Sequence, residues 1–263
     1  LAEGNLVRIL VTGSAGFIGA HLCPELEAHG HFVARADIEL SPLHDLLVPV
    51  NVNKLLDECA PDVVVHLAAK VGRLFGEDDR IRTVMDNVAM TAMIASECGH
   101  RGIRVVYAST SEVYGDTLEH PQKETYWGPV NCVNPRGCYD ESKRYAEALT
   151  GAYGQAGVDV RVARIFNTYG PRMSLDDGRV VPAFVSQALR GEALTVFGDG
   201  SQTRSFCYVD DLVGGLVALY DRGDGLPVNL GNPVELTMLQ FADAVRAAAG
   251  STSPTRFLPL PKD

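Results

Sequence analysis

The chain has 263 residues, of which 46% are hydrophobic, 21% charged and 7% aromatic. These fractions are typical of a globular protein and exclude a disordered chain, which lacks the apolar residues needed for a core. Lysine and arginine number 23 against 33 aspartate and glutamate, so the net charge is −10. Such a charge repels phosphate backbones, and we therefore expect no nucleic-acid partner. Any anionic substrate must be held by a few local cations.

Five short apolar runs have the length and β-branched composition of strands buried on both faces. They are Leu6–Val11, Phe32–Ala36, Val63–Leu67, Ile103–Ala108 and Val158–Ile165. Helical stretches alternate with them, at Ile18–Ala28, Ile81–Glu97 and Ser142–Gln155. This alternation predicts an α/β fold, a Rossmann-like doubly wound parallel sheet with right-handed crossovers.

The segment from Ile38 to Pro61 is short for this scheme, because it should hold two crossovers and a further strand at Leu46–Val50. A crossover with its helix normally needs at least about 10–12 residues. Either the first crossover is an irregular loop or residues are absent there. After Phe166 the pattern becomes irregular, with many Gly and Pro residues and a late helix at Leu236–Ala249. We predict a first domain over residues 1–166 and a smaller C-terminal lobe over residues 167–263, partly interleaved with the first.

No apolar run approaches the ~18 residues of a membrane span, and the first residues, LAEGN, lack the basic start and apolar core of a signal peptide. The six cysteines form no CxxC pair and show no metal-ligand spacing. This pattern favours reduced thiols and no metal site. We therefore expect a cytoplasmic protein that makes no contact with membranes.

A glycine-rich turn, VTGSAGFIG, follows the first predicted strand and opens a helix. Its glycines permit a tight turn, approach of a pyrophosphate to the backbone, and close packing of the helix on the sheet. Asp37 lies 18 residues beyond Gly19, at the end of the next strand, where it would bind ribose hydroxyls and favour NAD over NADP. The predicted NAD contacts here are Gly13, Gly16, Phe17, Ile18, Gly19 and Asp37. Two alternatives stay open: Arg35 pairing with the 2′-phosphate of NADP, and a turn that binds another ligand.

A second constellation consists of Thr110, Tyr139 and Lys143. Thr110 lies at the carboxyl end of a predicted strand, where open α/β sheets bind ligands. Tyr139 and Lys143 are one helical turn apart, so the ammonium would favour the phenolate; lowering the tyrosine pKa by about 3 units requires roughly 4 kcal/mol. Thr110 would share a hydrogen bond with a substrate hydroxyl while Tyr139 takes its proton and hydride leaves to NAD. A YxxxK pair alone is common on helix surfaces, and only its combination with the glycine turn and Thr110 is specific.

With these motifs the chain resembles, over nearly its whole length, the extended short-chain dehydrogenase/reductase family of nucleotide-sugar epimerases and dehydratases. The similar segments include ASTSEVYGD, NPRGCYDESKR, VRVARIFNTYGPRM and LTVFGDGSQTRSFCYVDDLV. Within the family they are most similar to the UDP-glucuronate decarboxylases. The resemblance implies oxidation of the sugar at carbon 4, loss of carbon dioxide from the β-keto acid, and re-reduction to UDP-xylose with tightly bound NAD. It also implies that residues 1–166 bind NAD and that residues 167–263 bind the UDP-sugar, in a lobe that is incomplete at its C-terminus.

The resemblance assigns further residues. Leu67, Ala68, Ala69 and Asn87 lie near the cofactor in the family, as do Tyr139 and Lys143. Ser111 and Glu112 are the pair expected of a decarboxylase, Ser111 bonding the leaving carboxylate and Glu112 positioning the ring or assisting protonation. Arg179 is implied as a catalytic residue that binds the sugar carboxylate or steers ring pucker. The implied substrate-binding residues are Asn167, Arg179, Thr195, Phe197, Gln202 and Arg204.

Several alternatives remain at this level. Another 4-epimerase or 4,6-dehydratase of the family is possible on the same motifs, although a dehydratase would carry Asp-Glu after Thr110. A non-enzymatic Rossmann sensor would commonly lack the Tyr/Lys pair. Trp127 either anchors a loop in the core or lines the substrate cleft. The helices at Ile81–Glu97 and Ser142–Gln155 carry more apolar surface than one face needs, which resembles the family's four-helix dimer seam and predicts a homodimer.

Overall fold

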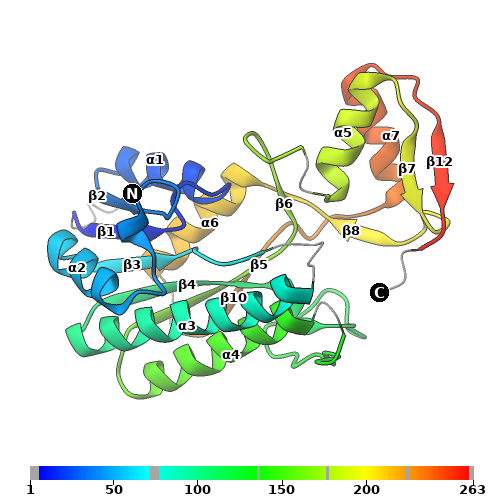
Figure 1. The fold of residues 1–263 in the computed structure, drawn as a ribbon. Helices are drawn as coiled ribbons and strands as arrows, with labels where there is room; N and C mark the ends of the chain where they lie inside the picture. The colour runs from blue at the N-terminus through cyan, green and yellow to red at the C-terminus, as the bar shows by residue number, and fades with distance from the viewer. Residues whose placement is uncertain (1–5, 72–76, 135–136, 176–177, 223–224, 261–263) are drawn as a thin grey trace. The chain divides into compact units, whose positions relative to one another are not determined.

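A computed structural model of the chain describes residues 6–71, 77–134, 137–175, 178–222 and 225–260 (Figure 1). Within these ranges six parallel strands form one sheet in the order β10-β5-β4-β3-β1-β2. The strands are β1 (Arg8–Thr12), β2 (Phe32–Ala36), β3 (Val63–His66), β4 (Arg104–Thr110), β5 (Val160–Ile165) and β10 (Pro227–Leu230). The chain runs from β1 outward to β2, then crosses back to β3 and continues outward to β10. This is the doubly wound topology that the sequence predicts.

Helices cover both faces of the sheet (Figure 1). α1 (Gly19–Ala28) packs against α6 (Val209–Arg222) on one face. On the other face α3 (Glu77–Arg101) packs against both α2 (Pro49–Cys59) and α4 (Gly137–Gln155). α4 begins five residues before the predicted helix, so Tyr139 and Lys143 both lie on it.

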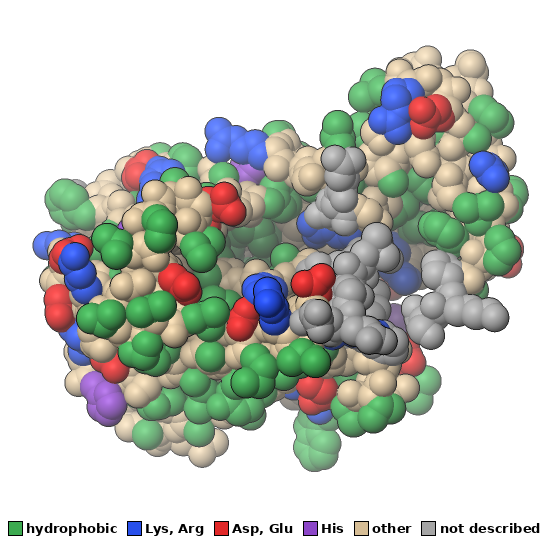
Figure 2. Space-filling view, in the orientation of Figure 1, with side chains coloured by type: hydrophobic (Ala, Val, Ile, Leu, Met, Phe, Trp, Pro, Cys, Tyr) green, Lys and Arg blue, Asp and Glu red, His purple; other side chains and the backbone are tan. Residues whose placement is uncertain are grey.

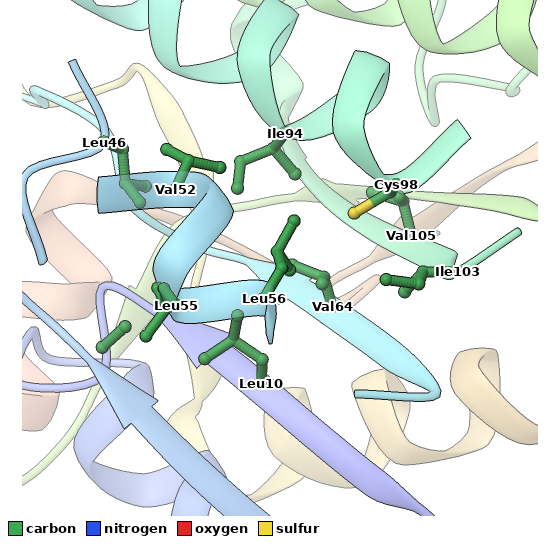
Figure 3. Packing of buried hydrophobic residues seen from close by; sticks show 11 residues of the cluster. Leu10, Leu46, Val52, Leu55, Leu56, Val64, Ile94, Cys98, Ile103 and Val105 are labelled. Carbon is green, nitrogen blue, oxygen red and sulfur yellow. The ribbon is translucent and has the colours of Figure 1, made fainter. Parts of the chain in front are cut away.

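The strand predicted at Leu46–Val50 is wrong. A short 3-10 helix, η1 (Pro42–His44), comes before this segment, and α2 begins at Pro49. Leu46 is nevertheless buried, in a cluster with Val52 and Leu56 of α2 and with strand residues (Figure 3). Its apolar character therefore reflects a turn that enters the core. Because β3 lies directly beside β1, a single crossover through α2 is sufficient, and the segment is long enough.

The chain divides into two compact units. The first contains Leu1–Val71, Phe75–Ile165 and Val209–Leu230, and the second is formed mainly by Phe166–Tyr208 and Gly231–Asp263. Residues 209–230, which form α6 and β10, therefore return to the first unit and extend its sheet.

The second unit is built from one helix pair and three strand pairs within the described residues. Its elements are β6 (Thr168–Tyr169), α5 (Val180–Arg190), β7 (Leu194–Phe197), β8 (Thr203–Ser205), β9 (Cys207–Tyr208), β11 (Glu235–Thr237), α7 (Met238–Ala249) and β12 (Thr255–Leu258). Phe184 of α5 stacks on Phe241 of α7, and Leu194 of β7 is fully buried in the same cluster. This small core fixes α5 and α7 against each other.

In the described part of the chain, every helix is too short or too polar to cross a membrane. The same residues contain no group of three or more His, Cys, Asp and Glu side chains that could hold a metal ion.

Candidate active site

The candidate site begins at the glycine turn between β1 and α1. Gly13 has φ +72°, and a Cβ atom there would lie 2.7 Å from the backbone nitrogen of Ala68. A Cβ at Gly19 would lie 2.4 Å from the carbonyl oxygen of Gly13. Both positions therefore require glycine, one for conformation and close approach, the other because the helix packs directly on the turn.

The turn suits the phosphates of a dinucleotide. α1 has no side-chain cap at Ile18 and no acidic residue in its first turn, so no carboxylate competes with an anion at the positive end of its helix dipole. The buried hydroxyl of Ser14 has no hydrogen-bond partner within the described structure. An uncapped helix end beside an unpaired hydroxyl is the environment that a bound pyrophosphate would complete.

Asp37 lies at the end of β2, as expected for a ribose ligand. Its Oδ2 accepts a hydrogen bond from the Ala15 backbone at 3.0 Å and its Oδ1 accepts one from the Glu39 backbone at 3.0 Å. The carboxylate is therefore fixed against the turn and keeps lone pairs for further donors. Arg35 instead pairs with Glu27, with its guanidinium nitrogen 2.8 and 2.9 Å from the two carboxylate oxygens. That pairing removes support for the alternative in which Arg35 binds a 2′-phosphate.

The HLAA segment, His66–Ala69, continues from the end of β3 beside the same turn. The Leu67 backbone donates to the carbonyl of Thr12 at 3.1 Å, and Ala68 is the residue that a Gly13 side chain would strike. Asn87 of α3 is buried and brackets the backbone that follows Ala69: its Oδ1 accepts from Lys70 N at 2.8 Å and its Nδ2 donates to Lys70 O at 3.1 Å. Asn87 also donates to Ser142 of α4 at 3.2 Å. These contacts fix the rim of the predicted cofactor site to the helix that carries Tyr139 and Lys143.

Lys143 is the most unusual side chain of the site, because it is a lysine that is only 4% exposed. Its Nζ donates to the carbonyl of Ala108 at 2.7 Å, lies 4.9 Å from the ring centre of Tyr107 and 6.0 Å from that of Tyr139. Burial lowers its pKa from 10.5 to about 8, and the nearby Glu147 carboxylate opposes this shift. The ammonium is therefore retained at neutral pH.

The segment after β4 forms η2 (Ser111–Tyr114), a single 3-10 turn. Thr110 caps it, with its Oγ1 accepting from the Glu112 backbone at 3.3 Å. Arg144 of α4 donates to the carbonyl of Val113 at 2.8 Å, which ties the turn to the helix of Tyr139. Thr110 is 8% exposed, whereas Ser111 and Glu112 are partly exposed. The structure thus holds all five predicted catalytic residues of the first unit on two adjoining elements, η2 with its cap and α4.

Two further residues of this region, Glu147 and Ser109, were not predicted from the sequence. Glu147, one helical turn after Lys143, accepts from Arg164 of β5, with Arg164 nitrogens at 2.7 and 3.0 Å from its two oxygens. Ser109, beside Thr110, donates to the same carboxylate at 2.5 Å. Two sequence signals could have indicated the Glu147–Arg164 pair. One is the i,i+4 spacing from Lys143 to Glu147, and the other is the charge of Arg164 within an apolar strand.

His66, the first residue of the HLAA segment that the resemblance places near the cofactor, is a further buried group of this region. Its Nδ1 is 2.8 Å from the Thr12 hydroxyl, while its Nε2 is buried without a partner in the described structure. Burial, and secondarily the Lys143 ammonium, lowers the pKa of His66 to about 3. The ring is therefore neutral at physiological pH and packs as a buried polar group beside the candidate site.

In the second unit, the structure gathers several predicted substrate residues around β7 and β8. Thr195 exchanges hydrogen bonds with Gln187, through its N–H at 3.0 Å and its hydroxyl at 3.1 Å. Gln202 donates to the carbonyl of Phe197 at 2.7 Å and so closes the turn between the two strands. Arg204 is exposed on β8. Thr195 and Gln202 therefore have defined structural contacts in this unit.

The two remaining predicted residues of this unit stand outside that turn. Asn167 is exposed, and its carbonyl accepts from the Cys207 backbone at 2.8 Å. Arg179 is partly buried and precedes the first residue of α5. Trp127, in the first unit, is 88% exposed, so its interpretation as a core anchor is wrong.

Gly13, Asp37, Leu67 and Thr110 all lie at or directly after the carboxyl ends of parallel strands, and such ends meet at one edge of a sheet. The fold and this edge define a Rossmann-like dinucleotide-binding protein. The chain belongs to the NAD dependent epimerase/dehydratase family, whose model matches residues 9–231.

Relatives in this family are similar along the whole chain. It is 45% identical over 282 residues to UDP-glucuronic acid decarboxylase 1 of Danio rerio, covering 100% of this chain and 66% of the relative. It is 46% identical over 268 residues to UDP-glucuronic acid decarboxylase 1 of Arabidopsis thaliana, covering 98% of this chain and 62% of the relative. The chain thus spans less than two thirds of the length of these relatives. The crystal structure of UDP-glucuronic acid 4-epimerase from Bacillus cereus in complex with NAD is 29% identical, with a TM-score of 0.80, 95% coverage of this chain and 87% of that chain.

Proposed function

We propose that this protein is an NAD-dependent UDP-glucuronate decarboxylase that releases carbon dioxide and forms UDP-xylose. The observation that carries the proposal is the buried Lys143 ammonium on α4, 6.0 Å from the Tyr139 ring centre and bonded to the strand that ends at Thr110. Similarity to the decarboxylases of Danio rerio and Arabidopsis thaliana supports the substrate and the outcome.

In the proposed reaction the chain's own residues move one proton at the carbon 4 hydroxyl. Thr110 orients that hydroxyl and Tyr139, as the phenolate stabilised by Lys143, accepts its proton. The glycine turn and Asp37 would hold NAD, which when bound would supply reversible hydride chemistry at carbon 4, so that no external oxidant would be consumed. At the end of the cycle Tyr139 gives the proton back to the carbon 4 oxygen.

The ketone at carbon 4 makes the sugar a β-keto acid, which loses its carboxylate readily because the resulting enolate is delocalised. We assign Ser111 to the departing carboxylate, and Glu112 to positioning of the ring or to protonation of carbon 5. Arg179 would bind the carboxylate before it leaves or steer the ring pucker, since a guanidinium fork matches its two oxygens. One proton is taken up and one carbon dioxide released, which balances the conversion.

The nucleotide diphosphate is assigned to residues of the second unit. Arg204 and Asn167 are both exposed there and offer an Arg fork and an amide to the phosphate oxygens. Thr195 and Phe197 would border the uracil, with Gln202 holding the turn between them. Phe197 is 42% exposed, which leaves ring surface available for stacking on a base.

We also propose a homodimer formed through α3 and α4. Hydrophobic side chains gather over these two helices (Figure 2), and Ile81 and Met85 of α3 are 67% and 64% exposed. Tyr145 of α4 is 43% exposed. Such a surface is larger than a solvated helix pair requires, and a second copy would cover it.

The proposal is tested by incubating the full chain with UDP-glucuronate and NAD, and by measuring released carbon dioxide together with the mass and stereochemistry of the product. We expect equal amounts of carbon dioxide and UDP-xylose. Inversion at carbon 4 without loss of mass would support the 4-epimerase alternative. The similar structure from Bacillus cereus is a UDP-glucuronic acid 4-epimerase, so the same substrate tests both functions. Absence of any transient reduced-nicotinamide absorbance after substrate addition would favour a sensor.

The matched variant for this assay is Tyr139→Phe, which keeps the ring beside Lys143 and removes the acid/base group. It should lower turnover by about 10³-fold, within the range of a lost general acid/base, while UDP and NAD affinity stay unchanged. Turnover close to that of the wild type would exclude Tyr139 as the base.

A further inference from the structure

The active-site region contains a buried ion pair that the proposed mechanism does not use. Arg164 and Glu147 side chains are 11% and 14% exposed, and the pair joins β5 to α4 one helical turn beyond Lys143. Isolated surface pairs of this kind contribute little, whereas a buried pair needs all its hydrogen bonds satisfied. Here the fork of Arg164 meets both oxygens of Glu147, and the carboxylate accepts a third donor from Ser109.

The contacts of this pair surround the segment that carries Thr110, Ser111 and Glu112. Ser109, immediately before the segment, is bonded to Glu147 at 2.5 Å. Tyr114, at the end of the same segment, accepts a hydrogen bond from Arg164 at 2.8 Å and donates to Asn229 of β10 at 2.7 Å. One ion pair therefore holds both ends of η2 and its cap.

The Arg164–Glu147 pair also affects the charge state of Lys143. Glu147 lies at i+4 from Lys143 on α4, and its carboxylate favours the ammonium against the cost of burial. The other groups that face Lys143 within the described structure are His66 of β3, Tyr107 of β4 and Tyr139 of α4. Among the described side chains of α3, those that contact this cluster are neutral: Asn87 bonds to Ser142 and Thr91 bonds to Tyr107. Glu147 is thus the anion among them, and Arg164 and Ser109 hold it in place.

We propose that Glu147, held by Arg164 and Ser109, is a positioning residue that fixes the Thr110–Glu112 segment against α4 and maintains the charge of Lys143. This inference deepens the proposed function and rests on it. Glu147 touches no reacting atom in this scheme and acts through Lys143 and through the backbone that carries Thr110. Its removal should therefore reduce kcat and leave KM for the UDP-sugar nearly unchanged.

The first test reads the charge of Lys143 directly. The chain has only five lysines, so protein labelled with ¹³C at lysine Cε gives few signals, and a Lys143→Arg variant identifies the one from Lys143. In Glu147→Gln protein the titration midpoint of Lys143 should fall by about one pH unit, because the nearby anion is gone. An unchanged midpoint would overturn the charge role.

The second test reads turnover, with variants that separate charge from tethering. Glu147→Gln should lower kcat about tenfold at neutral pH, with little change in KM. Ser109→Ala keeps the ion pair and removes one tether, so kcat should fall by about threefold while the Lys143 midpoint stays in place. Wild-type kcat in Ser109→Ala protein would overturn the tethering role.

A matched control is the Arg104–Asp159 pair, which joins β4 to the start of β5 at the opposite end of the strands, with Nε and Oδ2 2.6 Å apart. Asp159→Asn should change neither the Lys143 midpoint nor kcat. If Glu147→Gln alone does not fold, the double variant Glu147→Gln, Arg164→Gln leaves no buried charge unpaired. Its midpoint should fall by less than in the single variant, because loss of the Arg164 cation partly offsets loss of the Glu147 anion.

The two proposals fail in different ways. A chain that releases no carbon dioxide from UDP-glucuronate but shows the Lys143 shift would overturn the proposed substrate and keep the positioning role. A decarboxylase whose Lys143 titration and kcat ignore Glu147 would keep the function and overturn this inference.

Discussion

His66 illustrates how burial at a single residue determines pH behaviour. The ring is 2% exposed, contacts Tyr107 at a centroid distance of 6.1 Å, and shares a hydrogen bond with Thr12. Burial, with a smaller contribution from Lys143, lowers its pKa to about 3 from an ordinary 6.5. The folded protein therefore binds no proton at His66 over a pH range in which the unfolded chain does.

This difference predicts acid sensitivity. The stabilisation from neutral His66 is complete above pH 6.5 and is lost as pH falls toward 3, at roughly 1.4 kcal/mol per pH unit. His66→Asn places an amide near Nδ1 but cannot titrate, so its free energy of unfolding should be lower at pH 7 and fall less steeply between pH 6.5 and 4. Urea unfolding at a series of pH values measures both slopes, and parallel curves would contradict the argument.

At the scale of elements, the crossover between β2 and β3 depends on how α2 ends. The helices α5 and α7 end at Gly191 and Gly250, which have left-handed φ values of 70° and 59°. α2 ends in the same conformation at Ala60, with φ 42°, and its N–H donates to the Leu56 carbonyl. A left-handed backbone is costly for a residue with a Cβ, so this cap is strained.

The strain predicts a stabilising substitution. Ala60→Gly should raise the free energy of unfolding by about 0.5–1 kcal/mol, because relief of the left-handed conformation exceeds the added entropy of the unfolded chain. The control Ala152→Gly, at an exposed interior position of α4, should lower it by about 1 kcal/mol. Thermal unfolding of the two variants should therefore move in opposite directions; a decrease for both would show that Ala60 is not strained.

At the scale of the whole molecule, the proposed homodimer depends on the exposed apolar side chains of α3 and α4. Met85 is 64% exposed on α3, and Val50 of α2 is 68% exposed, which makes a control of similar exposure. If α3 and α4 form the dimer seam, Met85→Asp buries two charges at the interface and should yield monomers, whereas Val50→Asp should leave dimers intact. Sedimentation velocity separates the two outcomes. A wild-type chain that is monomeric at working concentration would refute the dimer.

The sequence by itself determined those features that depend on local spacing. Alternating apolar runs predicted five strands of the sheet. The glycine turn and the i,i+4 relation of Tyr139 and Lys143 indicated the two halves of the candidate site. These features can be predicted because a backbone turn and a helical turn each depend on residues only a few positions apart in the sequence. The same spacing could not place the substrate residues of the second unit, for which family resemblance was needed.

Only the tertiary structure decided which distant segments meet. Leu46 reads as part of a strand but enters the core from a turn, and residues 209–230 return to complete the first unit. Glu147 and Arg164 are each unremarkable charges in the sequence, yet packing of α4 on β5 buries them together beside Lys143. Their partnership arises from long-range packing in a low-dielectric interior, where each charge requires the other, and no local pattern encodes that requirement.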